Sequence, residues 1–218
     1  MWQAVLFDLD GTLTDPKIGI TKAVAYALAQ FGITVEALDD LCPFIGPPLG
    51  ESFQTLYHFD EAQVQEAIAQ YRVYFSATGI YENELYSGIP QLLAQLQQQG
   101  RTIILATSKP TVYARAILEH FQIAPYFHFV SGSELDGTRT KKAEVITHAL
   151  QQCGIADTAT AVMVGDREHD IIGAAATGLA SVGVCWGYGS RTELTEASAG
   201  RVVDTVAELA AILLRSCF

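Results

Sequence analysis

The chain has 218 residues, half of them hydrophobic, which is enough to bury a substantial core in one domain with an insertion or in two small domains. Its formal net charge of −11 argues against nucleic-acid polymers and anionic membranes as partners, because binding them depends on Lys and Arg that displace counterions from phosphates. No apolar run approaches the roughly 20 residues that span a bilayer, and no basic-then-apolar leader opens the sequence, so we expect a cytoplasmic protein.

The cysteines lie far apart and show no paired spacing. This pattern favours reduced thiols over a zinc site or a disulfide framework. The cysteines are Cys42, Cys153, Cys185 and Cys217.

The first predicted strand ends in a cluster of charge. Residues 4–7 form an uninterrupted apolar run, which is typical of a strand buried on both faces of a parallel sheet. Asp8 and Asp10 follow immediately, and Gly11 closes the segment. Ligands of open α/β sheets bind at the carboxyl ends of strands, so these carboxylates stand where chemistry would occur. An Asp-Gly pair is also ordinary turn chemistry, so this segment alone does not decide the function.

Residues 16–86 show helical patterns and no convincing strand. Asp15 can cap a first helix, and a second helix is predicted over residues 49–57. Asp60 and Gln63 have the spacing of a capping box at the start of a third helix. We therefore predict an all-helical insertion.

From residue 87 onward, strand and helix patterns alternate, as in a parallel sheet covered by helices. Further strands are predicted over residues 102–106, 127–130, 161–164, 181–185 and 202–203. The expected fold is α/β: a Rossmann-like, three-layer α/β/α core of residues 1–15 and 87–218, with the helical domain 16–86 inserted.

Four loops that should meet at one edge of this sheet carry polar side chains. Right-handed crossovers place the ends of parallel strands on the same edge, so convergence is expected from topology. The candidate residues are Asp8 and Asp10 after the first strand, Thr107, Ser108 and Lys109 after the second, Arg139 and Lys141 before a later helix, and Asp166 and Asp170 after the strand 161–164.

This set of residues suits phosphoryl transfer. A carboxylate can attack phosphorus and form an aspartyl phosphate, the role we assign to Asp8. Asp10 can protonate the leaving alcohol and later accept a proton from water, an effect of about 10²–10⁴ in rate. Mg²⁺ prefers oxygen ligands, which Asp8, the backbone carbonyl of Asp10 and Asp166 would supply. Thr107 and Lys141 would neutralise charge on the phosphoryl oxygens.

The remaining candidates have supporting roles in this interpretation. Ser108, Lys109 and Arg139 are predicted to bind the substrate, since basic and hydroxyl groups near the phosphate can contact its oxygens. Asp170 is predicted to support the cation site.

The segments Asp8–Leu13 and Gly165–Asp170, with Thr107 after a strand and a lysine before a helix, resemble the four signature motifs of the haloacid dehalogenase superfamily of hydrolases. The motifs occur in order, and the resemblance covers essentially the whole chain. It implies a magnesium-dependent phosphomonoesterase with a Rossmann-like core. The helical insertion is similar to the small cap of the phosphoglycolate phosphatase branch, which closes over the substrate.

Within that branch, residues 15–20 and 132–139 look more like the members described as 5′-nucleotidase-like than like phosphoglycolate phosphatases. Many members have Lys-Pro where this chain has Lys141-Lys142, so either lysine could face the phosphate. We predict Lys141, because it occupies the position of the motif.

The sequence therefore predicts a magnesium-dependent phosphatase acting on a small phosphorylated metabolite. A phosphomutase could use the same aspartates and cation while returning the phosphoryl group to its sugar phosphate. A third alternative is a catalytically idle protein that binds a phosphorylated ligand on the same fold. The presence of every motif residue argues against this last alternative.

Overall fold

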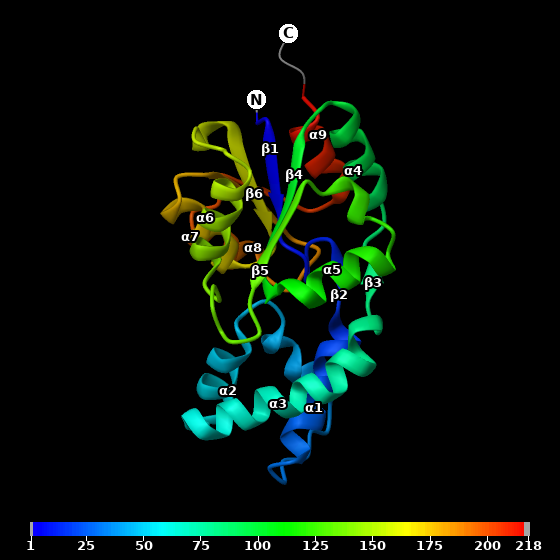
Figure 1. Ribbon diagram of the computed structural model, residues 1–218, viewed down its shortest axis with the longest axis vertical. Helices are drawn as coiled ribbons and strands as arrows, with labels where there is room; N and C mark the ends of the chain where they lie inside the picture. Colours follow the sequence, from blue (N-terminus) through cyan, green and yellow to red (C-terminus); the bar gives the residue numbers. More distant parts are fainter. Residues whose placement is uncertain (1, 216–218) are drawn as a thin grey trace. The chain divides into compact units, whose positions relative to one another are not determined.

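The computed structural model describes residues 2–215, which form two compact units (Figure 1). The core unit joins the residues up to Thr14 with those from Leu85 onward, and the helical unit is Asp15–Glu84. We predicted the boundaries after residues 15 and 86, and the division into these units comes after Thr14 and after Glu84.

Among the described residues, the core unit contains one six-stranded sheet in the order β5-β4-β1-β6-β7-β8, with every pairing parallel. Its strands are β1 (Ala4–Phe7), β4 (Thr102–Pro110), β5 (Phe129–Ser133), β6 (Ala161–Gly165), β7 (Ala180–Val184) and β8 (Arg201–Val203). Phe7 at the end of β1 pairs with Leu105 of β4 and with Val164 of β6. β1 ends at this level of the sheet and β6 ends one residue later, whereas β4 continues to Pro110.

Helices cover both faces of the sheet; Figure 1 shows α6 and α7 on one side and α4 and α9 on the other. Their bounds are α4 (Ile89–Gln98), α5 (Thr111–His120), α6 (Lys142–Gln152), α7 (Glu168–Ala176), α8 (Arg191–Glu196) and α9 (Val206–Leu213), with short 3-10 helices η3 (Ala124–Tyr126) and η4 (Thr158–Thr160). Val145 and Ile146 of α6 pack against Leu6, Ile104 and Met163 in a fully buried cluster. The predicted three-layer α/β/α fold is confirmed.

The helical unit is described over its whole length and contains three α-helices and two 3-10 helices. They are α1 (Lys17–Ala29), η1 (Leu38–Phe44), α2 (Leu49–Tyr57), α3 (Glu61–Ala77) and η2 (Gly79–Tyr81). The predicted capping box is present: the Asp60 side chain accepts the N–H of Gln63 at 2.9 Å, and the Gln63 side chain accepts the N–H of Asp60 at 3.0 Å. Rings of Phe44, Phe53 and Phe59 pack together in the core of this unit.

The prediction that residues 16–86 contain no strand is wrong at their end. Strand β3 (Glu84–Leu85) pairs with β2 (Thr14–Asp15) in a two-stranded sheet. Two residues are too few to produce an alternation of apolar and polar side chains, so the sequence pattern gave no signal.

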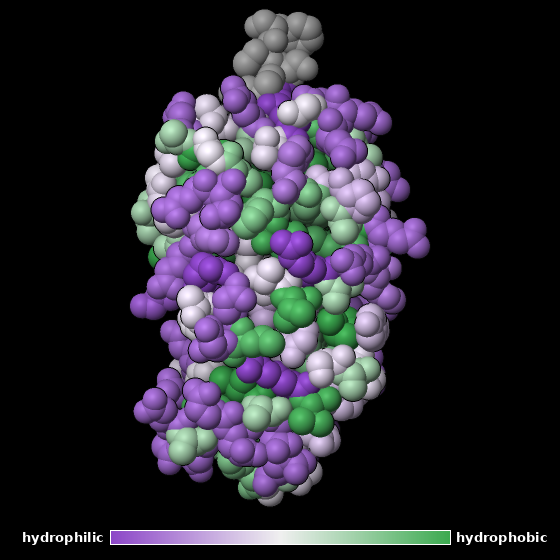
Figure 2. Space-filling model, viewed as in Figure 1, coloured by the Kyte–Doolittle hydropathy of each residue, from purple (hydrophilic) through white to green (hydrophobic). Residues whose placement is uncertain are grey.

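Hydrophilic side chains cover much of the visible surface, and hydrophobic ones occur there in small groups (Figure 2). None of the helices within residues 2–215 combines the length and the hydrophobicity that crossing a membrane requires. Three of the predicted reduced thiols, Cys42, Cys153 and Cys185, are free, and Cys217 lies outside the described residues.

Candidate active site

Three buried carboxylates meet beyond the ends of β1 and β6. Asp8 directly follows β1, and its N–H donates to the carbonyl of Val164 at 2.9 Å. Asp166 follows β6, and Asp170 lies in the first turn of α7. One oxygen from each of these aspartates lies within 4.8 Å of those of the other two. The structure thus brings together Asp8 and Asp166, the predicted cation ligands, and Asp170, the predicted supporting residue.

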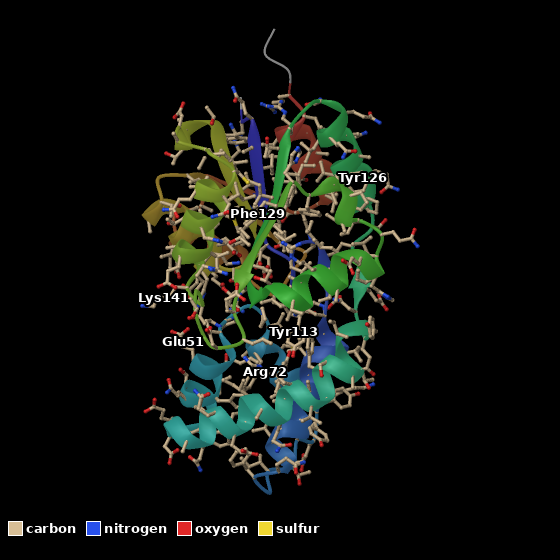
Figure 3. All side chains as sticks on the ribbon, in the orientation of Figure 1. Glu51, Arg72, Tyr113, Tyr126, Phe129 and Lys141 are labelled. Atoms are coloured by element: carbon tan, nitrogen blue, oxygen red, sulfur yellow. The ribbon has the colours of Figure 1, made fainter. Side chains whose placement is uncertain are left out.

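The lysine in this group is Lys142. Its Nζ lies 2.9 Å from Oδ1 of Asp8 and 2.7 Å from Oδ1 of Asp170. It also donates to the carbonyl of Ala106 at 3.2 Å. Lys141 is exposed and lies at the outer edge of the ribbon in Figure 3. We predicted Lys141 for this position, and the structure places Lys142 there instead.

The start of α6 explains this correction. Lys141 is the N-cap, with extended backbone, and Lys142 is the first helical residue. Cα–Cβ bonds of a helix tilt toward its N-terminus, so the Lys142 side chain extends past the helix start toward the sheet edge. Gly173 of α7 makes room for it, because a Cβ there would lie 2.8 Å from Cγ of Lys142.

Asp10 forms a second buried ion pair. Nζ of Lys109, at the end of β4, lies 2.5 Å from Oδ2 of Asp10. The other oxygen, Oδ1, is buried and has no hydrogen-bond partner among the described residues. We predicted Lys109 to bind substrate, but the structure places its ammonium against Asp10. The cation ligand predicted from Asp10 was its backbone carbonyl, and that role remains a prediction.

Of the other predicted substrate contacts, Thr107 and Ser108 lie in the last part of β4, and Arg139 lies in the loop before α6. Thr107 is buried, and its hydroxyl accepts the N–H of Lys109 at 3.3 Å. Ser108 is half-buried, and its carbonyl accepts from the hydroxyl of Ser133 at 2.7 Å. Arg139 is half-buried and forms an ion pair with Glu134. Contacts of these three residues with a substrate remain predictions.

A loop after β7, for which the sequence predicted no functional role, fixes the position of Asp166. The N–H of Tyr188 donates to Oδ2 of Asp166 at 2.7 Å, and the hydroxyl of Thr12 donates to Oδ1 at 3.1 Å. A Cβ at Gly187 would collide with Oδ2 of Asp166 and with the carbonyl of Gly11. The available signal was the position of this glycine-rich loop at the same carboxyl edge of the sheet.

Burial is the largest influence on the pKa values of Asp10, Asp166 and Asp170. Burial, together with the charges of Asp170 and Asp8, raises the pKa of Asp166 to about 8. Burial raises the pKa of Asp170 to about 6, even though Lys142 opposes the shift. Burial also raises the pKa of Asp10, against the opposing charge of Lys109. For Lys142, burial lowers the pKa, but the charges of Asp170 and Asp8 outweigh it, so the pKa is raised.

The donor set fits a divalent cation. The grouped atoms of Asp8, Asp166 and Asp170 are all carboxylate oxygens, the ligands that hard cations prefer. The ammonium of Lys142 contacts two of these aspartates, and no ion pair with Lys or Arg reaches Asp166 within the described part of the chain. A bound cation would compensate the remaining negative charge.

Comparisons with known proteins agree with this site. A family model described as haloacid dehalogenase-like hydrolase matches residues 5–184. The chain is 51% identical over 190 residues to a protein from Pseudomonas aeruginosa named 5′-nucleotidase, covering 87% of this chain and 86% of that protein. It is 41% identical over 207 residues to the tyrosine-protein kinase PtkA of Mycobacterium tuberculosis, covering 95% of this chain and 70% of that protein.

A solved structure described as a predicted phosphatase from Clostridium acetobutylicum is also similar. It superposes with a TM-score of 0.96 at 48% identity, covering 98% of this chain and 99% of that chain. The family match spans most of the sequence, and it includes Asp8, Asp10 and Asp166. The chain therefore belongs to the haloacid dehalogenase-like hydrolase family and is a phosphatase of that family.

Proposed function

We propose that the protein is a Mg²⁺-dependent phosphatase that hydrolyses a small phosphate monoester through an aspartyl phosphate at Asp8. The observation that carries this proposal is the meeting of Asp8 with Asp166, Asp170 and the ammonium of Lys142 at one edge of the sheet. A nucleoside 5′-monophosphate is the first candidate substrate, because the Pseudomonas aeruginosa relative is named 5′-nucleotidase. Phosphoglycolate is the second, because other relatives carry that name at about 30% identity.

In the first step, a carboxylate oxygen of Asp8 attacks phosphorus, and the bond to the leaving oxygen breaks. Lys142, beside Asp8, offsets the charge of the phosphoryl oxygens, and the hydroxyl of Thr107 would donate to them. Asp10 gives its proton to the leaving alcohol. The raised pKa of Asp10 makes the protonated form more accessible than it is for an exposed aspartate.

In the second step, Asp10 accepts a proton from water, whose oxygen attacks phosphorus. The acyl phosphate bond to Asp8 breaks, inorganic phosphate leaves, and both aspartates return to their initial forms. The transfer is thus divided into two displacements.

A cation would be held by Asp8 and Asp166, with the backbone carbonyl of Asp10 as a further ligand. Asp170 would bind the cation directly or hold Lys142 in place. When bound, Mg²⁺ supplies positive charge that lets an anionic nucleophile approach an anionic phosphate.

The test is phosphate release from a panel of esters, measured with Mg²⁺ and with EDTA. The panel contains p-nitrophenyl phosphate, nucleoside 5′-monophosphates, 2-phosphoglycolate and sugar phosphates. We expect Asp8→Asn to abolish release while circular dichroism stays unchanged. Full activity in that variant, or in EDTA, would contradict the proposal.

Two further measurements address the alternatives. A phosphomutase would convert a sugar 1-phosphate to its 6-phosphate without releasing phosphate, which product analysis detects. Because PtkA is named a kinase, the panel also includes ATP with a tyrosine peptide. We expect the esters of the panel to yield inorganic phosphate and the tyrosine peptide to remain unphosphorylated.

A further inference from the structure

We propose that Lys109 is a positioning residue that aims the carboxylate of Asp10 at the leaving group of the substrate. The inference rests on the proposed function, in which Asp10 is the general acid. It replaces the expectation that Lys109 binds the substrate phosphate.

The ion pair leaves the two oxygens of Asp10 in different environments. Oδ2 lies 2.5 Å from Nζ of Lys109, while Oδ1 is buried without a hydrogen-bond partner among the described residues. The side chain of Lys109 is 5% exposed and that of Asp10 is 11% exposed. A buried ammonium that donates a charge-assisted hydrogen bond to one oxygen restricts the rotation of the carboxylate. The other oxygen is then available for proton transfer.

The strand that carries Lys109 is irregular at this point. The register between β4 and β5 shifts between Ala106 and Pro110, where the regular pairing is interrupted. Such irregularities change the direction of a side chain at the end of a strand. The N–H of Lys109 donates to the hydroxyl of Thr107 at 3.3 Å within this segment.

Strand β5 packs closely against the same segment. A Cβ at Gly132 would lie 2.5 Å from the carbonyl of Lys109 and 2.8 Å from the nitrogen of Thr111, so the two backbones approach more closely than side chains allow. The hydroxyl of Ser133 donates to the carbonyl of Ser108 at 2.7 Å. The backbone at Lys109 is therefore held against β5, and positioning of a catalytic group requires such support.

The need for positioning depends on the leaving group. An alkyl alcohol leaves poorly as an anion and needs the proton of Asp10, whereas p-nitrophenolate leaves without one. Misplacing a catalytic group by 1 Å costs about 10²-fold in rate. Loss of Lys109 should consequently affect alkyl esters much more than p-nitrophenyl phosphate.

The experiment measures kcat/KM, which reports the step in which the leaving group departs, for p-nitrophenyl phosphate and for the best alkyl phosphate of the panel. Lys109→Met removes the ammonium and keeps the aliphatic stem. We expect it to lower kcat/KM about 10²-fold for the alkyl ester and less than about tenfold for the aryl ester. Lys109→Arg can still donate to Oδ2 of Asp10 and should retain part of the alkyl activity. If Lys109→Met does not fold, Lys109→Arg takes its place in the comparison of the two esters.

Asp10→Asn separates this inference from the proposed function. If Asp10 is the acid, that variant lowers alkyl kcat/KM by about 10²–10⁴ and spares the aryl ester. Adding Lys109→Met to Asp10→Asn should then cause no further loss, because both changes act through one carboxylate.

Two results would overturn the role of Lys109 alone. One is an equal loss on both esters in Lys109→Met, as direct phosphate binding would give, while Asp10→Asn stays selective. The other is an additional loss in the double variant. If Asp10→Asn itself is not selective, the acid role in the proposed function fails, and the positioning role fails with it.

Discussion

Nζ of Lys142 lies 2.9 Å from Oδ1 of Asp8, although Lys142 starts α6 and Asp8 directly follows β1. Both side chains are almost fully buried. A lysine and an aspartate held this way place positive charge beside the proposed nucleophile before any substrate arrives.

The adjacent lysines provide a matched test of this relationship. We expect Lys142→Met to lower kcat at least about 10²-fold, because charge on the phosphoryl oxygens loses its partner. It should also lower the free energy of unfolding by about 3–5 kcal/mol, since Asp8 and Asp170 stay buried without the ammonium of Lys142. Steady-state kinetics and urea denaturation measure the two effects.

Lys141→Met removes the same charge from the neighbouring residue, which is exposed. It should change kcat and the free energy of unfolding little. Equal losses in the two variants would contradict the assignment of Lys142.

Asp166→Asn should stabilise the cation-free protein. The substitution removes one of three clustered charges, and an amide can still accept from the N–H of Tyr188 while it donates to the hydroxyl of Thr12. Burial already raises the pKa of Asp166 to about 8, which shows that the charged form is unfavourable there. We expect an increase of about 1 kcal/mol or more in EDTA, or about 2–4 °C in Tm.

The same variant should lose the stabilisation that Mg²⁺ gives the native protein, because ligands stabilise only the state that binds them. Thermal scans with and without Mg²⁺ measure both effects. A lower Tm in EDTA, or an unchanged Mg²⁺ shift, would argue against Asp166 as a ligand.

Gly187→Ala should weaken Mg²⁺ binding about 10–100-fold, the usual cost of disturbing groups that orient a ligand. The added methyl would collide with Oδ2 of Asp166, whereas at Gly50 of α2 the nearest contact would be an ordinary 3.4 Å, to Val64. Gly50→Ala is therefore the control and should preserve Mg²⁺ affinity. Titration of the Mg²⁺ dependence of phosphate release compares them; equal affinities would show that the loop does not position Asp166.

The sequence predicted the sheet and the meeting of Asp8 with Asp166, because apolar runs and topology determine both. It did not distinguish Lys141 from Lys142, since that choice depends on the residue at which α6 begins. It also missed the ion pair of Lys109, because β4 continues to Pro110 with a register shift that leaves no pattern in the sequence. Topology thus predicts which loops meet, while side-chain direction depends on local backbone geometry.

The three glycines that crowd the carboxylates have a consequence for cation choice. Gly11 and Gly187 lie so close to the carboxylate of Asp166, and Gly165 so close to that of Asp170, that a Cβ at any of them would collide with it. Main chain at these glycines lies against the two carboxylates, and it cannot rotate away as a side chain can to admit a wider coordination sphere. Ca²⁺ takes oxygens at about 2.3–2.6 Å and Mg²⁺ at about 2.0–2.1 Å, so we expect discrimination by ionic radius, with Ca²⁺ giving a smaller thermal shift than Mg²⁺ at equal concentration.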